Sequence, residues 1–325
     1  MVSALFSPIQ VKDVRFRNRA VMPPMVTLLA DEAGRVTDDL VEHYLARARA
    51  GTALIIVEAT CVDEKGRIWE RGIGAWRDDH VSGLARLAGA IKGEGAVAGI
   101  QLVHGGPQTS VELCGERLGP SEADPPQGGP RPRAMTVAEI RAAQQSFVSA
   151  AARCAETGFD LVEVHGAHDY LLDSFVSAAT NQRTDEYGGA FRNRIRNLVE
   201  TCARVKDRAG DKPLVCCRFS IFNKEPGEWG TQDLELLVGE LKRAGVDVLH
   251  ASTDGALKPC LGTGETIGRL VKRATDLPII VAGGLGNPHF AERAVAEGHA
   301  DFAAIGQAMF DDTDWTIRAK AALGA

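Results

Sequence analysis

Two histidines, an aspartate and a tyrosine lie close together where an apolar run ends. The stretch VEVHGAHDYLLDSF (162–175) contains His165, His168, Asp169 and Tyr170. Imidazole, carboxylate and phenol groups can ligate a metal, transfer a proton or hydrogen-bond to a substrate. They can also simply satisfy local hydrogen bonds in a loop, so the elements around them have to be considered.

A metal site would need a third ligand beside the two histidines. Asp169 is a neighbour, but the sequence contains no His-Glu-x-x-His motif and no carboxylate cluster nearby. We therefore predict no metal site. Two interpretations stay open, namely histidines held by hydrogen bonds in a turn, and paired donors for one anionic or carbonyl oxygen. The second also uses Tyr170, as a proton source, and so explains all three residues together.

These residues follow one of several short apolar runs that alternate with amphipathic stretches. The runs show little alternation of polar and apolar residues, as expected for parallel strands covered on both faces. One amphipathic stretch begins with a capping box, Thr136-x-x-Glu139. The predicted strands are 19–25, 53–59, 96–103, 160–165, 213–220, 247–252, 278–284 and 301–306. The predicted helices are 38–50, 80–93, 136–157, 192–208, 231–244, 263–274 and 289–297.

This alternation predicts a (β/α)8 TIM barrel, an α/β fold, as a single domain over residues 1–325. A doubly wound sheet is the rival, but no Gly-x-Gly-x-x-Gly follows the first strand, and GTGETIG (262–268) has the wrong spacing. In a barrel, active sites lie at the C-terminal ends of the strands. Gln101, the two histidines, Tyr170 and Arg218 would then converge on one rim.

Two further features would lie on the same rim. Residues 105–133 form a long connection rich in Gly and Pro, and such a loop is usually either functional or disordered. We predict that it covers the substrate, with an inert insertion as the alternative. Gly283, Gly284 and Gly306 follow the last two strands, where barrels commonly bind phosphate through backbone N–H groups. A tight turn would also explain these glycines.

Composition restricts the class of partner. The chain carries a net charge of -6, which argues against nucleic acid or an anionic membrane surface as a partner. No apolar run approaches the roughly 20 residues of a membrane span, and the N-terminus lacks the features of a signal peptide. The seven cysteines include no Cys-x-x-Cys pair. An odd number of scattered cysteines suits free thiols in a reducing compartment, so we expect a cytoplasmic protein.

The sequence resembles the old yellow enzyme family of FMN-dependent barrels, and within it the 2,4-dienoyl-CoA-reductase-like branch. The resemblance covers nearly the whole chain, from NRAVMPPMVT (18–27) through IQLVHGG (100–106) to ADFAAIGQAMFDD (300–312). Its most specific motifs are His-Gly-Ala-His-x-Tyr-Leu at 165–171 and Asn-x-Arg-Thr-Asp-x-Tyr-Gly-Gly at 181–189. The family fold is a (β/α)8 barrel with FMN at its C-terminal mouth, in agreement with the pattern of strands and helices.

The resemblance implies a role for each residue of the rim. Arg218 would place a positive charge beside the flavin N1–C2 carbonyl, and His165 and His168 would donate to a substrate carbonyl oxygen. Reduced flavin N5 would pass hydride to the β-carbon, and Tyr170 would protonate the α-carbon. The residues that would hold FMN are Pro24, Met25, Val26, Ala59, Gln101, His165, Arg218, Gly283, Gly284, Gly306 and Gln307.

The implied function is that of an ene-reductase, an FMN-dependent oxidoreductase that reduces the C=C bond of an α,β-unsaturated carbonyl compound with electrons from NADH or NADPH. Two alternatives stay open: a double-bond isomerase or dehydrogenase on the same site, and a flavin-binding subunit of a larger electron-transfer complex. Dienoyl-CoA reductases of this branch continue past the barrel with iron–sulfur and FAD domains. Because this chain ends at Ala325, we expect it to take electrons directly from NAD(P)H or from a separate donor subunit. A homo-oligomer is compatible with the sequence.

Three residues depart from the usual pattern of the family. Gln307 replaces an arginine that pairs with the FMN phosphate, so we expect weaker flavin affinity. Val26 replaces Thr, Cys or His near flavin C4=O, which should shift the redox potential. Asp169 replaces the glycine between His168 and Tyr170. Asp tolerates unusual backbone angles better than most residues, and its carboxylate should repel anionic substrates and raise the pKa of a neighbouring histidine.

Overall fold

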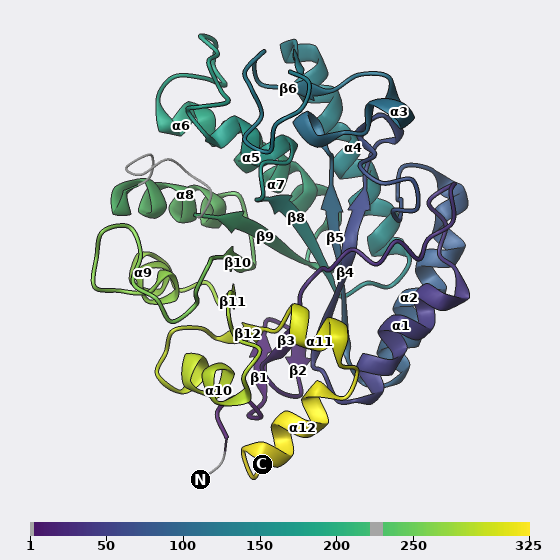
Figure 1. Cartoon of the computed structure of the whole chain (residues 1–325), viewed down its shortest axis with the longest axis vertical. Coiled ribbons are helices and arrows are strands. Elements are labelled where there is room, and N and C mark those ends of the chain that lie inside the picture. The colour runs from purple at the N-terminus through teal and green to yellow at the C-terminus, as the bar shows by residue number, and fades with distance from the viewer. Residues whose placement is uncertain (1–2, 222–229) are drawn as a thin grey trace.

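The computed structural model describes residues 3–221 and 230–325. In this part of the chain, eight parallel strands close into a barrel because β12 pairs with β3 (Figure 1). The strands are β3 (Ala20–Met22), β4 (Leu54–Cys61), β5 (Val97–Val103), β8 (Leu161–Gly166), β9 (Leu214–Ser220), β10 (Val248–Ser252), β11 (Ile279–Ala282) and β12 (Phe302–Ala304). Each predicted strand overlaps one of them, so the (β/α)8 prediction is confirmed.

Helices surround the barrel (Figure 1). The longer ones are α1 (Asp38–Arg49), α2 (Val81–Gly93), α4 (Val137–Glu156), α7 (Arg196–Ala209), α8 (Thr231–Arg243), α9 (Ile267–Ala274), α10 (Pro288–Ala296) and α12 (Trp315–Ala322). The capping box of Thr136 and Glu139 is present at the start of α4. Helix α12 was not predicted, because its apolar residues do not gather on one face and so leave no helical period in the sequence.

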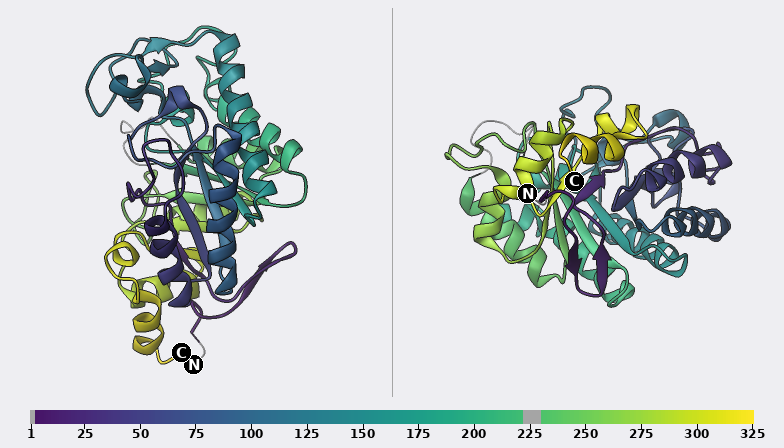
Figure 2. Two further views of the ribbon diagram at one scale, coloured as in Figure 1. Left: turned by 90° about the vertical axis from the view of Figure 1, so that its right-hand side faces the viewer. Right: turned by 90° about the horizontal axis from the view of Figure 1, so that it is seen from below.

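Short elements complete the fold. They are the hairpin β1 (Ile9–Val11) and β2 (Val14–Phe16), the pair β6 (Leu118–Gly119) and β7 (Arg133–Ala134), the helices α3 (Val111–Cys114), α5 (Leu171–Val176), α6 (Phe191–Arg194) and α11 (Gln307–Asp311), and the 3-10 turns η1 (Glu64–Gly66), η2 (Asp78–His80) and η3 (Gly106–Gln108). The hairpin and the 105–133 segment lie at opposite ends of the molecule (Figure 2). The segment is not an irregular loop, since it contains η3, α3 and β6.

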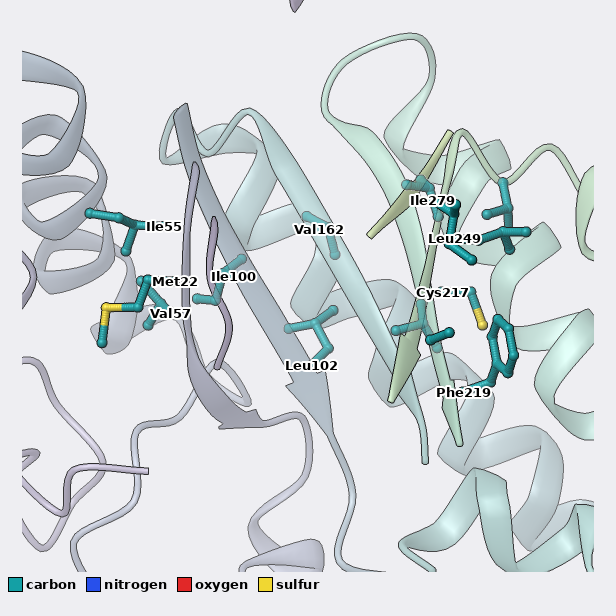
Figure 3. Close-up of a cluster of buried hydrophobic side chains, with 14 of the residues drawn as sticks. Met22, Ile55, Val57, Ile100, Leu102, Val162, Cys217, Phe219, Leu249 and Ile279 are labelled. Atoms are coloured by element: carbon teal, nitrogen blue, oxygen red, sulfur yellow. The ribbon is translucent and has the colours of Figure 1, made fainter. Parts of the chain in front are cut away.

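Side chains that point outward from the strands form the main core. Ile100, Leu102 and Val162 belong to it, and Figure 3 shows them with further members. A smaller cluster fills the N-terminal half of the barrel interior, where Phe16 of β2 meets Phe302 edge to face with ring centroids 4.9 Å apart. Because side chains alternate along a strand, the next inward positions toward the C-terminal ends lie above this apolar floor. On β5, β8, β9 and β10 those positions are polar.

The described part of the chain contains no helix that is both long and apolar enough to cross a membrane.

Candidate active site

Four strands bring polar side chains to the C-terminal mouth of the barrel. Gln101 (β5), His165 (β8), Arg218 (β9) and Ser252 (β10) occupy inward positions near the ends of their strands, and all four are buried. His165 and Arg218 are partners in the register of β8 and β9, so they lie side by side. The structure therefore brings together Gln101, His165 and Arg218, as the position of the strand ends predicted.

Ser252 links Arg218 to His168 and was not among the predicted site residues. Arg218 Nη2 donates to Ser252 Oγ over 3.2 Å, and the same oxygen lies 3.0 Å from His168 Nε2. The sequence could have predicted Ser252 as a site residue, because it lies at the end of the sixth barrel strand and each strand end at this face brings a side chain to the mouth.

The two histidines and Tyr170 form one cluster. The ring centroids of His165 and His168 are 5.1 Å apart, and those of His165 and Tyr170 are 5.2 Å apart. Burial, helped by His168 and Arg218, holds the pKa of His165 well below its usual value. His165 is therefore a neutral imidazole near pH 7.

The backbone conformation at position 169 restricts which residue types can stand there. His168 and Asp169 both have left-handed backbone angles, with φ of 62° and 59°. Asp is one of the few residues that visit this region readily, which agrees with the expectation for a position where the family has glycine. The Asp169 N–H donates to Asp173 Oδ2 over 2.8 Å, and Asp169 Oδ2 accepts from Gln127 Nε2 over 2.5 Å.

Tyr170 stands half-buried between an imidazole and an indole. Its ring meets Trp69 edge to face at a centroid distance of 6.3 Å. Burial raises the pKa of Tyr170 to about 12, although the positive charge of Arg218 works in the opposite direction. The phenol therefore keeps its proton throughout the neutral range. Trp69 was not predicted, because it lies in a long connection after the second barrel strand rather than at a strand end.

The 105–133 segment is tied to the same motif. Besides Gln127, Gln108 Nε2 donates to the carbonyl oxygen of His168 over 2.6 Å. From the other side, Arg183 Nη1 donates to the carbonyl oxygens of Pro120 (2.9 Å) and Met135 (2.6 Å). Arg183 belongs to the second diagnostic motif of the sequence, so one role of that motif is to hold the segment in place.

The residues after the first barrel strand line the other side of the mouth. Strand β3 is shorter than predicted and ends at Met22, since two prolines follow and proline has no N–H for the ladder. Pro24 is buried, whereas Met25 and Val26 are partly exposed. Ala59 is 6% exposed and lies at a register shift of β4.

Of the predicted phosphate glycines, Gly283 and Gly284 also need to be glycine because of their backbone conformation. Gly283 has a φ of 145°, and a Cβ there would lie 2.3 Å from the Thr253 carbonyl oxygen. Gly284 has a φ of 66° and open space where a Cβ would be. A Cβ on Gly306 would lie 3.3 Å from Met25 Sδ, so the last strand end and the first meet here. Both interpretations of these glycines, tight turn and close approach of a ligand, therefore stand.

The Gln307 side chain is hydrogen-bonded within its own helix. The side chain is exposed, and Nε2 donates to Asp311 Oδ1 over 2.8 Å, one turn further along α11. The amide would have to leave Asp311 in order to contact a phosphate.

The polar groups at the mouth fit a heterocycle that carries hydrogen-bond acceptors, such as the FMN ring. Arg218 Nε and His165 Nδ1 are buried and have no hydrogen-bond partner among the described residues. Buried polar atoms of this kind normally have a partner, so both atoms are suited to a bound polar group. If the ring binds there, the guanidinium would add a positive charge, and a positive charge stabilises a reduced anionic flavin. Within the described ranges, no group of three or more His, Cys, Asp or Glu side chains could hold a metal ion.

Comparisons with known proteins show the family of the chain. A family model described as the NADH:flavin oxidoreductase / NADH oxidase family matches residues 4–324. An NADH oxidase of Thermoanaerobacter brockii is 36% identical over 97% of this chain and 50% of its own length, so the chain spans half of that relative. An NADPH dehydrogenase of Geobacillus sp. (strain WCH70) is also 36% identical, over 100% of this chain and 96% of its own length.

A solved structure of an old yellow enzyme homologue from Zymomonas mobilis superposes with a TM-score of 0.86. It is 26% identical and covers 99% of this chain and 93% of its own. Fold and site thus define a flavin-dependent oxidoreductase built on a single TIM barrel. The chain belongs to the NADH:flavin oxidoreductase / NADH oxidase family, the family of the old yellow enzymes. Its cofactors are FMN and NADH or NADPH.

Proposed function

We propose that the protein is an ene-reductase, which reduces the C=C bond of an α,β-unsaturated carbonyl compound. The observation that carries this proposal is the cluster of His165, His168 and Tyr170 beside Arg218 at the mouth of the barrel. Two nitrogen donors and one phenol on the same rim are what addition of hydride and proton across an enone requires.

The histidines stabilise the charge that develops on the substrate oxygen. Addition of hydride to an enone makes that oxygen negative, and donors placed there in advance are worth most in the transition state. His165 is neutral, so it donates without the cost of burying a second cation next to Arg218. Ser252 contacts both His168 and Arg218, and so holds the imidazole in place relative to the guanidinium.

Tyr170 supplies the proton. With its pKa raised to about 12, the phenol stays protonated until the α-carbon of the enolate becomes basic enough to take the proton. Bound FMN, once reduced by NADH or NADPH, supplies the hydride that is added to the β-carbon.

Other residues hold the cofactor and close the site. Gln101 and Arg218 would bind the pyrimidine edge of FMN, with His165 beside the ring; Pro24, Met25, Val26 and Ala59 would line it, and Gly283, Gly284, Gly306 and Gln307 would surround the phosphate. The 105–133 segment, held by Gln108 and Gln127, would cover the substrate and exclude water. Trp69 would form an aromatic wall next to Tyr170.

An anaerobic half-reaction experiment tests this function. The FMN-loaded protein should be bleached by NADH or NADPH, and an enone such as 2-cyclohexenone should restore the yellow colour and give the saturated ketone. A protein that is reduced by nicotinamide but reoxidised by no member of an enone panel would contradict the proposal. Conversion of an enone without nicotinamide would instead indicate double-bond isomerisation.

A further inference from the structure

A buried ionisable pair lies one layer below the mouth of the barrel. Glu163 of β8 and His250 of β10 are both 0% exposed and occupy inward positions directly beneath His165 and Ser252. Layers inside a TIM barrel are normally filled by branched apolar side chains. Since burial of a carboxylate costs free energy unless hydrogen bonds and a positive charge compensate it, an ionisable pair at this place needs a reason.

Both oxygens of the Glu163 carboxylate accept hydrogen bonds. Oε1 accepts from Gln101 Nε2 over 2.7 Å, and Oε2 lies 2.7 Å from His250 Nδ1. Cys216 Sγ also donates to Oε2 over 3.4 Å. Glu163 is the register partner of Gln101, and His250 is the register partner of Arg218. The pair is therefore connected to both residues that face the pyrimidine edge of the flavin in the proposed site.

The surroundings of Glu163 favour its carboxylate form. Burial alone would raise the pKa of Glu163, but His250, Arg218 and the Gln101 hydrogen bond outweigh it and leave the pKa below its usual value. Burial lowers the pKa of His250 despite the opposing effect of Glu163. Near pH 7, Glu163 is thus a carboxylate and His250 a neutral ring whose Nδ1–H donates to it. Arg218 provides the positive charge that faces this carboxylate.

An ionised carboxylate can only accept hydrogen bonds, and this decides the orientation of Gln101. The Gln101 amide has one end that donates and one that accepts. Because its Nε2 donates to Glu163, its carbonyl oxygen Oε1 is left as an acceptor for the ligand. An acceptor there matches the N3–H of a flavin, which is a donor.

We propose that Glu163 is a positioning residue of the flavin site, which fixes the Gln101 amide and partly offsets the positive charge of Arg218. Through the hydrogen bond to Gln101 and the charge interaction with Arg218, it sets the relative affinity of the protein for reduced and oxidised FMN. The inference rests on the proposed placement of the flavin at the mouth, but not on the identity of the substrate.

The variant Glu163→Gln removes the negative charge at nearly constant volume. Arg218 then acts on the flavin without an opposing charge, so the anionic reduced form gains more than the oxidised form. We expect the ratio of the two affinities to rise about tenfold, which raises the two-electron midpoint potential by about 30 mV. Oxidised FMN should bind more weakly, since the Gln101 amide is no longer held in one orientation.

A matched control is Cys216→Ala, which disturbs packing in the same layer but keeps the carboxylate. The midpoint potential is measured by anaerobic titration against a reference dye, and the affinity for oxidised FMN by fluorescence quenching. A Glu163→Gln potential that equals that of Cys216→Ala, or falls below it, overturns the proposal, since a purely structural role would affect both variants alike.

A measurement on the wild-type protein covers the case that Glu163→Gln does not fold. In the holoenzyme loaded with FMN labelled with 15N at N3, a hydrogen bond to the Gln101 carbonyl should move the N3–H proton resonance downfield. The resonance should shift upfield in Gln101→Leu. An N3–H resonance that is the same in both proteins refutes the orientation of Gln101. Neither experiment contains an enone, so failure of enone reduction and failure of this inference are separate results.

Discussion

Replacing Tyr170 by phenylalanine tests the proposed proton transfer with a single atom. The phenylalanine ring can keep the edge-to-face contacts with His165, at 5.2 Å, and Trp69, at 6.3 Å, so the cluster should keep its packing. A positioned general acid contributes about 10²- to 10⁴-fold to the rate. The lower limit corresponds to about 2.7 kcal/mol of activation free energy, at roughly 1.36 kcal/mol per factor of ten.

The two half-reactions of Tyr170→Phe should respond differently. Reduction of the bound FMN by NADH or NADPH does not use the phenol and should keep its rate. Reoxidation by 2-cyclohexenone, followed by anaerobic stopped-flow absorbance near neutral pH, should slow by at least about 10²-fold. Because the pKa of Tyr170 is about 12, the phenol stays protonated between pH 6 and 9. Loss of this proton should therefore not lower the wild-type rate of reoxidation in that range.

A second tyrosine provides the control. Tyr187 is buried away from the mouth, and its hydroxyl donates to Glu200 over 2.9 Å. Tyr187→Phe therefore removes the same atom and should cost about 1 kcal/mol of stability without changing either half-reaction. Reoxidation of Tyr170→Phe at the wild-type rate would refute the proton-donor role. An equal loss in both half-reactions would show that the substitution damages flavin binding instead.

Three further substitutions test Glu58, which is buried in β4, and two residues of the proposed site. Burial raises the pKa of Glu58 to about 7 against the opposing hydrogen bond from Thr27, so its proton binds the folded state more tightly. The stability that the Glu58 proton contributes is complete below pH 4.5 and is lost as the pH rises through 7. Glu58→Gln should therefore raise the free energy of unfolding at pH 8 by up to about 3 kcal/mol and have little effect at pH 4.5. Thermal melts at the two pH values measure this difference. Asp169→Gly should lower the KM for an enone that carries a carboxylate, with no change for a neutral enone, and an equal change for both would contradict a charge effect. Gln307→Arg should bind FMN about tenfold more tightly, since a charged donor adds on the order of 1.4 kcal/mol to the binding free energy. Fluorescence titration measures this affinity, and an unchanged value would place the phosphate elsewhere.

The sequence alone was sufficient for the fold and for the rim of the site. Apolar runs and amphipathic periods are local properties, so they located each barrel strand before any tertiary contact was known. Parallel strands have their C-terminal ends at the same face, so residues such as Gln101, His165 and Arg218 could be placed on one rim from their positions along the strands. Helix α12 has no amphipathic period, so the sequence did not predict it.

The contacts between neighbours inside the barrel could only come from the tertiary structure. Glu163 and His250 are 87 positions apart in the chain, and their contact depends on barrel closure and on the register of three strands. A pattern of apolar residues indicates which face of a strand is buried, but not which side chain lies opposite. The link from Arg218 through Ser252 to His168 was hidden in the same way.

The stretch around Asp169 shows both what the sequence determined and what the tertiary structure decided. The sequence alone determined that a cluster of His165, His168 and Tyr170 follows the fourth barrel strand, and that Asp169 stands where glycine is usual. Only the tertiary structure decided that Asp169 adopts a φ of 59° and accepts a hydrogen bond from Gln127 of the 105–133 segment. The reason is physical: residue types follow the chain, whereas hydrogen-bond partners are chosen among all groups that the closed barrel brings within reach.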